Sequence, residues 1–315
     1  MKPVLWIVSP CYNSTDVLPD TVPRFLKKLG DLVACGSISE ESRLLLLDDG
    51  SRDGTWDMIL RFRSENARIA AVKLAHNSGE QNAYLAGLFV AADHADVIVS
   101  MDCDLQDDLE ILDDMLRHYA DGCDIVYGVR SDRSADTPLY RFLSGGFYKV
   151  MKLCKTELVE QNSQYRAMSK RAVKMLQEFG ENEVFLPALV PLLGLKSAVV
   201  PYVRQERPAG DSGYSFGRLF RLAFSAIKSY SFAPVGIITA LALLSAVITA
   251  VCFIVFAVVS LRSGEFDRFS LLMTSVWGIG TFLLASARLI AGYLCSVCRE
   301  TKKRPRYQID ISLLD

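Results

Sequence analysis

The sequence predicts an α/β protein, with a mostly parallel β-sheet domain followed by two membrane-spanning helices. Short apolar runs alternate with longer segments of helical period in the N-terminal part of the 315-residue chain, as in parallel sheets with crossover helices. Two apolar segments near the C-terminus each exceed the roughly 20 residues that cross a bilayer. The predicted strands are residues 5–8, 44–47, 70–74, 97–101, 125–129 and 198–203, and helical period marks residues 55–63 and 80–92.

The fourth predicted strand ends abruptly in alternating carboxylates. Asp102 and Asp104 follow it with one residue between them, and they point the same way because residues alternate sides along an extended chain. Oxygen ligands placed in this way suit one divalent cation beside a diphosphate. The alternative is a solvated loop followed by a helix. For Asp107 and Asp108 we favour that plainer interpretation, as first-turn acids that suit the helix dipole.

Polar turns also follow the first three predicted strands, where parallel sheets bind ligands. Ordinary turn and cap chemistry explains the Asp-Gly pairs after the second strand, but not its two consecutive aspartates. The amides that open the helix at residues 80–92 suit a phosphate. These positions predict a shared crevice. The turn residues of interest are Pro10, Tyr12 and Asn13, then Asp48 and Asp49, then Asn77, Gly79 and Gln81.

The C-terminal apolar segments are predicted transmembrane helices. Residues 232–261 have no charged side chain and residues 269–298 have only Arg288, and runs this long are seldom needed in a globular core. The short connector 262–268 makes them an antiparallel hairpin. Lys and Arg are concentrated on the outer flanks of the hairpin, and no signal peptide precedes the first strand. The N-terminal domain and both termini are therefore expected on the cytoplasmic side of the membrane. Arg288 snorkels, packs in a helix bundle or contacts a lipid phosphate.

Two further segments, 139–155 and 214–231, have the pattern of basic amphipathic helices at a membrane interface, with packing on the sheet as the alternative. The expected organisation is an N-terminal α/β domain at 1–213, a juxtamembrane helix at 214–231, the two spans within 232–298 and a basic tail at 299–315. Membrane lipids are therefore expected partners. Small residues in the second span, Gly278 and Gly280, permit close approach between protomers, so a homo-oligomer is an open expectation.

Charge and cysteine usage exclude other classes of function. The formal net charge is −1, which argues against nucleic-acid binding. The eight cysteines show no repeated pair of ligand spacings, so a zinc site is not expected.

The ordered motifs resemble those of the family 2 polyprenyl-phosphate glycosyltransferases, which include dolichol-phosphate mannose synthases and bacterial undecaprenyl-phosphate glucosyltransferases. The resemblance covers almost the whole chain. It implies a GT-A (Rossmann-like) domain and the inverting transfer of one sugar from a nucleoside-diphosphate sugar to a polyprenyl phosphate. The motifs are Ser-Pro-Cys-Tyr-Asn at 9–13, Asp-Asp-Gly-Ser-Arg-Asp-Gly-Thr at 48–55, Asp-Cys-Asp-Leu-Gln at 102–106, Tyr165-Arg166, a Gly-x-Ser element at 210–212 and the two spans.

The resemblance also implies roles for individual residues. The nucleotide base and ribose would contact Pro10, Tyr12 and Asp49, with Asn13 beside them, although Ser14 stands where the family usually has Glu. The cation, Mg²⁺ or Mn²⁺, and the diphosphate would be held by Asp102, Asp104 and Gln106. The donor or acceptor phosphates would contact Arg204, Arg207 and Ser212, although Gly213 replaces a common Lys.

The sequence departs most from the family where many relatives have an aspartate base, because Gln164 occupies that position. A phosphate monoester has its second pKa near ~6, so the acceptor needs little deprotonation. Gln164 would then position the acceptor by hydrogen bonding, and Arg166 would bind phosphate. Glu160 is an alternative carboxylate.

We expect UDP-glucose as donor and undecaprenyl phosphate as acceptor, for cell-envelope glycan modification. The protein is expected to be a multi-pass protein of the bacterial inner (cytoplasmic) membrane, with its catalytic domain and both termini in the cytoplasm. The alternatives are another donor (a UDP-aminosugar, UDP-aminoarabinose or GDP-mannose) or, because of Gln164, a non-catalytic nucleotide-sugar-binding paralogue. A polysaccharide synthase is disfavoured, since only one hairpin is present and no Gln-x-x-Arg-Trp element is found.

Overall fold

A computed structural model describes residues 2–104, 106–131, 162–181, 184–203, 268–302 and 305–315. The chain divides into two compact units, one of Met1–Ser215 with Arg304–Asp315 and one of Phe216–Lys303. The predicted amphipathic helices at 139–155 and 214–231 and the predicted span at 232–261 lie outside the described residues.

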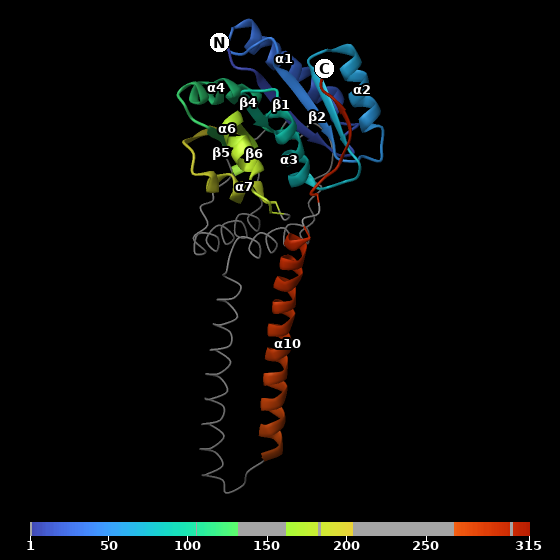
Figure 1. The fold of residues 1–315 in the computed structure, drawn as a ribbon, viewed down its shortest axis with the longest axis vertical. Coiled ribbons are helices and arrows are strands. Elements are labelled where there is room, and N and C mark those ends of the chain that lie inside the picture. The colour runs from blue at the N-terminus through green and yellow to red at the C-terminus, as the bar shows by residue number, and fades with distance from the viewer. Residues whose placement is uncertain (1, 105, 132–161, 182–183, 204–267, 303–304) are drawn as a thin grey trace. The chain divides into compact units, whose positions relative to one another are not determined.

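The first unit is built on an eight-stranded mixed sheet in the order β7-β5-β6-β4-β1-β2-β3-β8 (Figure 1). Strands β1 to β4 are mutually parallel where they pair, and β5 is parallel to β7. The two antiparallel strands are β6, between β4 and β5, and β8, on the edge beside β3. The bounds are β1 Leu5–Cys11, β2 Arg43–Asp48, β3 Ile69–Leu74, β4 Val97–Ser100, β5 Ile125–Arg130, β6 Asn162–Ser169, β7 Ser197–Tyr202 and β8 Ile309–Leu313.

Helices cover the sheet because its central strands are apolar on both faces. All residues of β4 and four consecutive leucines of β2 are buried, as expected of parallel strands between helical layers. The α/β class is confirmed. The helices are α1 Leu18–Ala34, α2 Thr55–Glu65, α3 Glu80–Ala91, α4 Leu112–Ala120, α6 Lys170–Gln177 and α7 Leu186–Leu189, with 3₁₀ turns η1 Leu109–Ile111 and η2 Pro191–Leu193.

All six predicted strands are present, but β6 and β8 were not predicted. Strand β6 begins with Asn, Ser and Gln, so it lacks the apolar run by which the other strands were recognised. Strand β8 lies in the stretch expected to be a basic tail. It pairs with β3, and the Ala75 N–H donates to the Gln308 carbonyl at 2.9 Å. The C-terminal residues are therefore part of the sheet.

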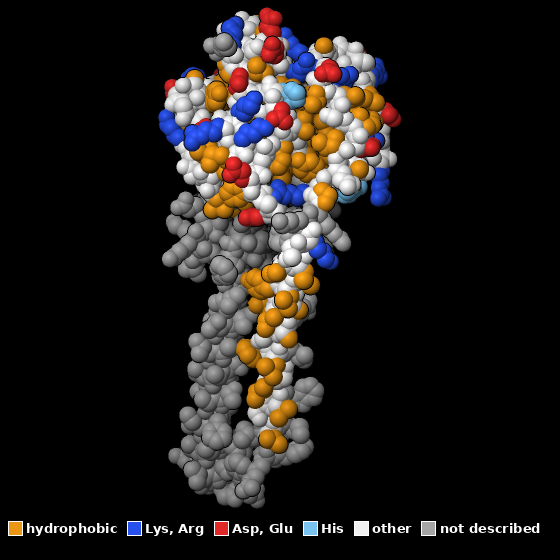
Figure 2. All heavy atoms as spheres, viewed as in Figure 1, with side chains coloured by type: hydrophobic (Ala, Val, Ile, Leu, Met, Phe, Trp, Pro, Cys, Tyr) orange, Lys and Arg blue, Asp and Glu red, His pale blue; other side chains and the backbone are white. Residues whose placement is uncertain are grey.

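In the second unit, one long helix, α10 (Arg268–Thr301), includes the second predicted span. Its stretch Gly278–Cys298 has a mean hydropathy of 1.6, and among the described residues it is the helix long and apolar enough to cross a membrane, by length and composition. Figure 2 shows apolar side chains along it. The exposed large ones are Leu272, Val276, Ile279, Leu283, Ile290, Leu294 and Val297.

Candidate active site

The turns that follow β1, β2 and β4 meet at one edge of the sheet because these strands are parallel neighbours. Cys11 lies opposite Asp48 in the register of β1 and β2. The Asp49 N–H donates to the Cys11 carbonyl at 2.9 Å, and the Met101 N–H donates to the Val8 carbonyl at 3.1 Å. The polar motifs that the sequence placed after separate strands therefore converge.

The turns after β1 and β2 are joined by hydrogen bonds that use Asn13 and Ser14. Asn13 has a positive φ of 50°. Its Oδ1 accepts from the Arg52 N–H at 3.0 Å, and its own N–H donates to Ser51 Oγ at 3.0 Å. The Ser14 N–H donates to Thr55 Oγ1 at 2.8 Å. The joined turns leave Tyr12 46% exposed, where its ring is accessible to a ligand, and Pro10 half-buried.

The two consecutive aspartates at the end of β2, Asp48 and Asp49, are buried and have different partners. Asp49 accepts hydrogen bonds from the backbone N–H groups of Ser78 at 2.7 Å and Gly79 at 3.1 Å. Burial raises the pKa of Asp49, and these two N–H groups oppose the rise. Asp48 accepts from the Ser51 N–H at 3.1 Å through Oδ1, while its Oδ2 is buried without a hydrogen-bond partner among the described residues.

The turn before α3 is therefore held by Asp49. Two of the N–H groups expected to hold a phosphate, those of Ser78 and Gly79, already donate to that carboxylate. Gln81 also contacts protein, because its Oε1 accepts from the Leu186 N–H at 3.0 Å. Asn77 is exposed at the tip of the turn.

The acidic turn after β4 is held by hydroxyl groups of helices α1 and α3. Thr21 Oγ1 donates to the Cys103 carbonyl at 2.7 Å, and the buried Tyr84 hydroxyl donates to Asp102 Oδ1. Within the turn, Asp104 Oδ1 accepts from the Gln106 N–H at 3.2 Å. Asp102, Asp104 and Gln106 are all half-buried.

The donor atoms of this turn fit a hard divalent cation. Carboxylate and amide oxygens are the ligands that Mg²⁺ and Mn²⁺ prefer, and Mg²⁺ usually takes one or two carboxylates and completes its shell with water and phosphate oxygens. Each carboxylate has about four lone-pair sites, so the bond from Tyr84 leaves Asp102 able to coordinate. In the described part of the chain, no group of three or more His, Cys, Asp or Glu side chains is arranged to hold a metal.

The interpretation of Asp107 as a first-turn helix acid is wrong. Asp107 is 3% exposed, accepts a hydrogen bond from the Tyr202 hydroxyl and lies 3.8 Å from Arg130 Nη2. Burial, helped by the negative charge of Asp102, raises the pKa of Asp107 to about 7. Asp108, by contrast, caps the following 3₁₀ turn by accepting from the Glu110 N–H at 3.0 Å, as expected.

Strand β6 brings Gln164 and Arg166 beside β4. Ser100 Oγ donates to the Gln164 carbonyl at 2.6 Å, and Arg166 Nη2 donates to Gln164 Oε1 at 2.9 Å. Arg166 is fully buried, which lowers its pKa to about 10, so its guanidinium is embedded in protein rather than presented at the surface. Glu160, Arg204, Arg207 and Ser212 lie outside the described residues.

Sequence reasoning missed three residues around the acidic turn. Tyr84, on α3, donates to Asp102, and Tyr202, on β7, donates to Asp107. Arg130, on β5, donates through Nε to Tyr202 Oη at 3.2 Å. The available signal was their position, since Arg130 directly follows the predicted strand 125–129 and Tyr202 is the next-to-last residue of the predicted strand 198–203. Tyr84 lies on a mostly buried helix and gave no signal.

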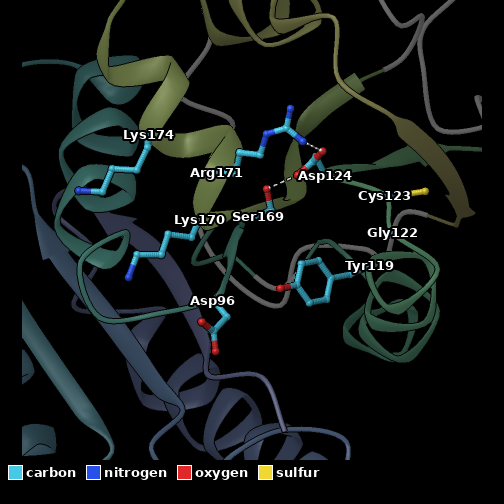
Figure 3. A pocket seen from close by; sticks show the side chains of 9 residues that line it. All are labelled: Asp96, Tyr119, Gly122, Cys123, Asp124, Ser169, Lys170, Arg171 and Lys174. Carbon is cyan, nitrogen blue, oxygen red and sulfur yellow. Dashed lines mark hydrogen bonds and ion pairs between the residues drawn. The ribbon is translucent and has the colours of Figure 1, made fainter. Parts of the chain in front are cut away.

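A large hollow lies at the other end of the sheet, where β4 and β5 begin. Figure 3 shows this cavity of about 660 Å³. Two of its cations are in ion pairs, since Arg171 lies 3.4 Å from Asp124 and Lys174 lies 2.5 Å from Asp93. Because it lies where β4 begins, the cavity is separate from the acidic turn, which follows the end of β4. It is lined by Asp96, Tyr119, Gly122, Cys123, Asp124, Ser169, Lys170, Arg171 and Lys174.

Comparison with known proteins points to sugar transfer. The family model for glycosyl transferase family 2 matches residues 6–176. An uncharacterized glycosyltransferase of Bacillus subtilis, YkoT, is 37% identical over 99% of this chain and 93% of its own length. A prophage bactoprenol glucosyl transferase homolog of Escherichia coli is 30% identical over 96% of this chain and 97% of its own.

A solved mannosyltransferase from Pyrobaculum calidifontis, in complex with GDP-mannose and Mn²⁺, has a TM-score of 0.47 and 15% identity to this chain, covering 96% of it and 87% of the solved chain.

Proposed function

Because this chain belongs to glycosyl transferase family 2, we propose that it transfers a single sugar from a nucleoside-diphosphate sugar to a polyprenyl phosphate. Glucose from UDP-glucose is the proposed sugar and undecaprenyl phosphate the proposed acceptor. The names of the Escherichia coli and Shigella phage relatives, bactoprenol glucosyl transferases, support this choice. The product would be a polyprenyl-phosphate sugar for cell-envelope glycans.

The observation that carries the proposal is the position of the acidic turn. Asp102 and Asp104 stand at the end of β4, beside the joined turns of β1 and β2. In α/β sheets ligands bind outside the carboxyl ends of the strands. A nucleotide bound over Tyr12 and Asp49 would place its diphosphate toward the acidic turn.

The proposed reaction is an inverting displacement. A phosphate oxygen of the acceptor attacks the anomeric carbon, and the bond from that carbon to the nucleoside diphosphate breaks. A divalent cation on the acidic turn would neutralise charge that develops on the departing diphosphate. Asp102, Asp104 and Gln106 would hold that cation and orient the diphosphate. The acceptor phosphate has its second pKa near ~6, so it is already an oxyanion at neutral pH. Gln164 therefore need not act as a base and would only line the binding site of the acceptor.

Arginine side chains are proposed to bind the phosphate of the acceptor. Arg130, at the end of β5, is partly exposed beside the acidic turn, whereas Arg204, Arg207 and Ser212 follow β7 in sequence. Guanidinium groups bind phosphate oxygens in pairs of charge-assisted hydrogen bonds. These residues would hold the acceptor opposite the donor.

A lipid acceptor suits a membrane-anchored enzyme. The length and hydropathy of α10 support one transmembrane helix. We propose residues 232–261 as the first helix of a hairpin, with the catalytic unit in the cytoplasm. Proteins that place two helices in one membrane often associate through small residues, so a homo-oligomer is part of the proposal.

The test is product formation by the purified full-length chain. Radiolabelled UDP-glucose, UDP-N-acetylglucosamine, UDP-aminoarabinose and GDP-mannose are each incubated with undecaprenyl phosphate and Mg²⁺ or Mn²⁺. A lipid-linked product with UDP-glucose is expected, and one of the other donors would correct the sugar. No product with any donor would contradict transfer and favour a nucleotide-sugar-binding paralogue.

Asp104→Asn tests the metal assignment in the same assay. We expect the rate to fall at least about 100-fold, because the neutral amide is a weaker cation ligand. Asp57→Asn, on the exposed side of α2, is the matched control. An unchanged rate in Asp104→Asn would remove this residue from the cation site.

A further inference from the structure

We propose that Tyr84 is a positioning residue that holds the carboxylate of Asp102 in place for the divalent cation. Tyr84 is 1% exposed in α3, and its hydroxyl donates to Asp102 Oδ1. The inference rests on the proposed function, because it takes the acidic turn as the cation site.

The phenol is fixed more firmly than the carboxylate that it contacts. Tyr84 belongs to a helix that packs on β1, β2 and β4, and a buried ring retains few rotamers. Asp102 is half-buried in a turn that follows the last residue of β4. The hydrogen bond therefore transmits the rigidity of the core to the carboxylate of Asp102.

Fixing one carboxylate oxygen affects cation binding in two ways. It removes rotamer freedom that Asp102 would otherwise lose on coordination, which lowers the entropic cost of binding the cation. It also engages Oδ1 and so orients the remaining lone pairs. Partners of metal ligands commonly change metal affinity 10–100-fold when removed.

Helix α3 links this contact to the nucleotide side of the site. Its N-cap residue is Gly79, whose N–H donates to Asp49 at 3.1 Å. Tyr84, further along the same helix, donates to Asp102. One rigid element thus sets the position of the turn after β2 relative to the acidic turn. The expected result is a cation placed correctly for the diphosphate, with no part for Tyr84 in bond making.

Tyr84→Phe is the decisive variant, since it removes the hydroxyl and keeps the ring in the core. Tyr119→Phe is the matched control, because Tyr119 is a partly buried tyrosine of α4 that lines the cavity at the other end of the sheet. Mn²⁺ binding to the full-length chain is measured by electron paramagnetic resonance in the presence of UDP. Metal-dependent rates and thermal midpoints are measured on the same preparations.

We expect Tyr84→Phe to raise the Kd for Mn²⁺ about tenfold. At saturating Mn²⁺ its kcat stays within about twofold of the wild-type value, and Tyr119→Phe leaves the Kd unchanged. A lower thermal midpoint or kcat with no change in Kd would show that Tyr84 only fills the core, and would overturn the inference. Product formation by the wild-type chain would still uphold transfer. A wild-type chain that forms product without binding Mn²⁺ overturns the inference and the metal assignment together.

Discussion

The backbone of Gly50 packs directly against that of Asn77: a Cβ added at Gly50 would lie 2.6 Å from the Asn77 nitrogen. Gly50 also has a φ of +66°, a conformation that other residues adopt at a cost. This contact fastens the turn after β2 to the turn before α3. The two turns carry Asp49 and the amides that bind it, so the donor side of the site depends on one close backbone approach.

Gly50→Ala is expected to destabilise the protein by about 2–4 kcal/mol, because it adds backbone strain and a clash that only backbone movement relieves. Donor KM should rise with it. Gly194→Ala is the matched control, since Gly194 has a φ of +63° but nothing within 4 Å of its added Cβ; it should cost about 1 kcal/mol. Thermal midpoints and donor KM values measure both effects. Equal effects of the two variants would show that backbone contact at Gly50 is unimportant.

Removal of β8 should also destabilise the turn before α3. Residues 309–313 pair with β3, and the Gln308 carbonyl accepts from Ala75, next to the turn before α3. A chain ending at Gln308 exposes the edge of β3, so we expect a lower thermal midpoint, a higher donor KM and more aggregation. The exposed Asp310→Ala is the control. Unchanged stability and KM in the shortened chain would contradict a role for β8.

The sequence predicted elements whose chemistry is local and missed those defined by distant partners. Strands β1 to β4 are apolar runs, so their composition identifies them. Strand β6 is a strand because its backbone pairs with β4 on one side and β5 on the other, and single-sequence patterns do not report pairing.

The candidate site divides in the same way. Asp102 and Asp104 were predictable because they follow an apolar strand directly. The contact of Tyr84 with Asp102 spans 18 residues and that of Tyr202 with Asp107 spans 95. Only the fold brings these hydroxyls to the acidic turn. Asp107 looked like a solvated helix acid because its burial arises from β5 and β7, which are distant in sequence.

Asp107 should make the metal-free protein less stable as pH rises. Its pKa in the folded chain is about 7, above the ordinary value of 3.8 for an aspartate, so the folded state binds more protons between those values. Stability from this carboxyl is therefore full below pH ~4, falls through pH 4–7 and is constant above. The loss is at most about 4 kcal/mol.

Asp107→Asn removes the titrating group and keeps an acceptor for Tyr202, so its thermal midpoint in chelator should not show this loss. The difference between the variant and the wild-type chain, followed from pH 4 to pH 8, isolates the contribution of Asp107. Asp57→Asn, at an exposed position, should follow the wild-type curve. A constant difference between Asp107→Asn and wild type would mean that Asp107 titrates near its ordinary pKa in the folded chain.

Gln164 is expected to support Arg166 rather than to act in proton transfer. Gln164→Leu removes the acceptor of a hydrogen bond from a buried guanidinium and should cost about 1.5–3 kcal/mol. Gln164→Glu keeps the hydrogen-bond acceptor for Arg166 and adds an opposite charge, so it should retain stability.

Gln164→Glu should also leave the pH dependence of kcat unchanged, because the phosphate of the acceptor substrate is proposed to need no base. A base contributes about 10²–10⁴-fold, so a comparable gain in Gln164→Glu, with a new limb in its pH profile, would show that the wild-type chain lacks a base it needs. If Glu160→Gln lowers kcat by a comparable factor and Gln164→Glu leaves kcat unchanged, the base would be Glu160.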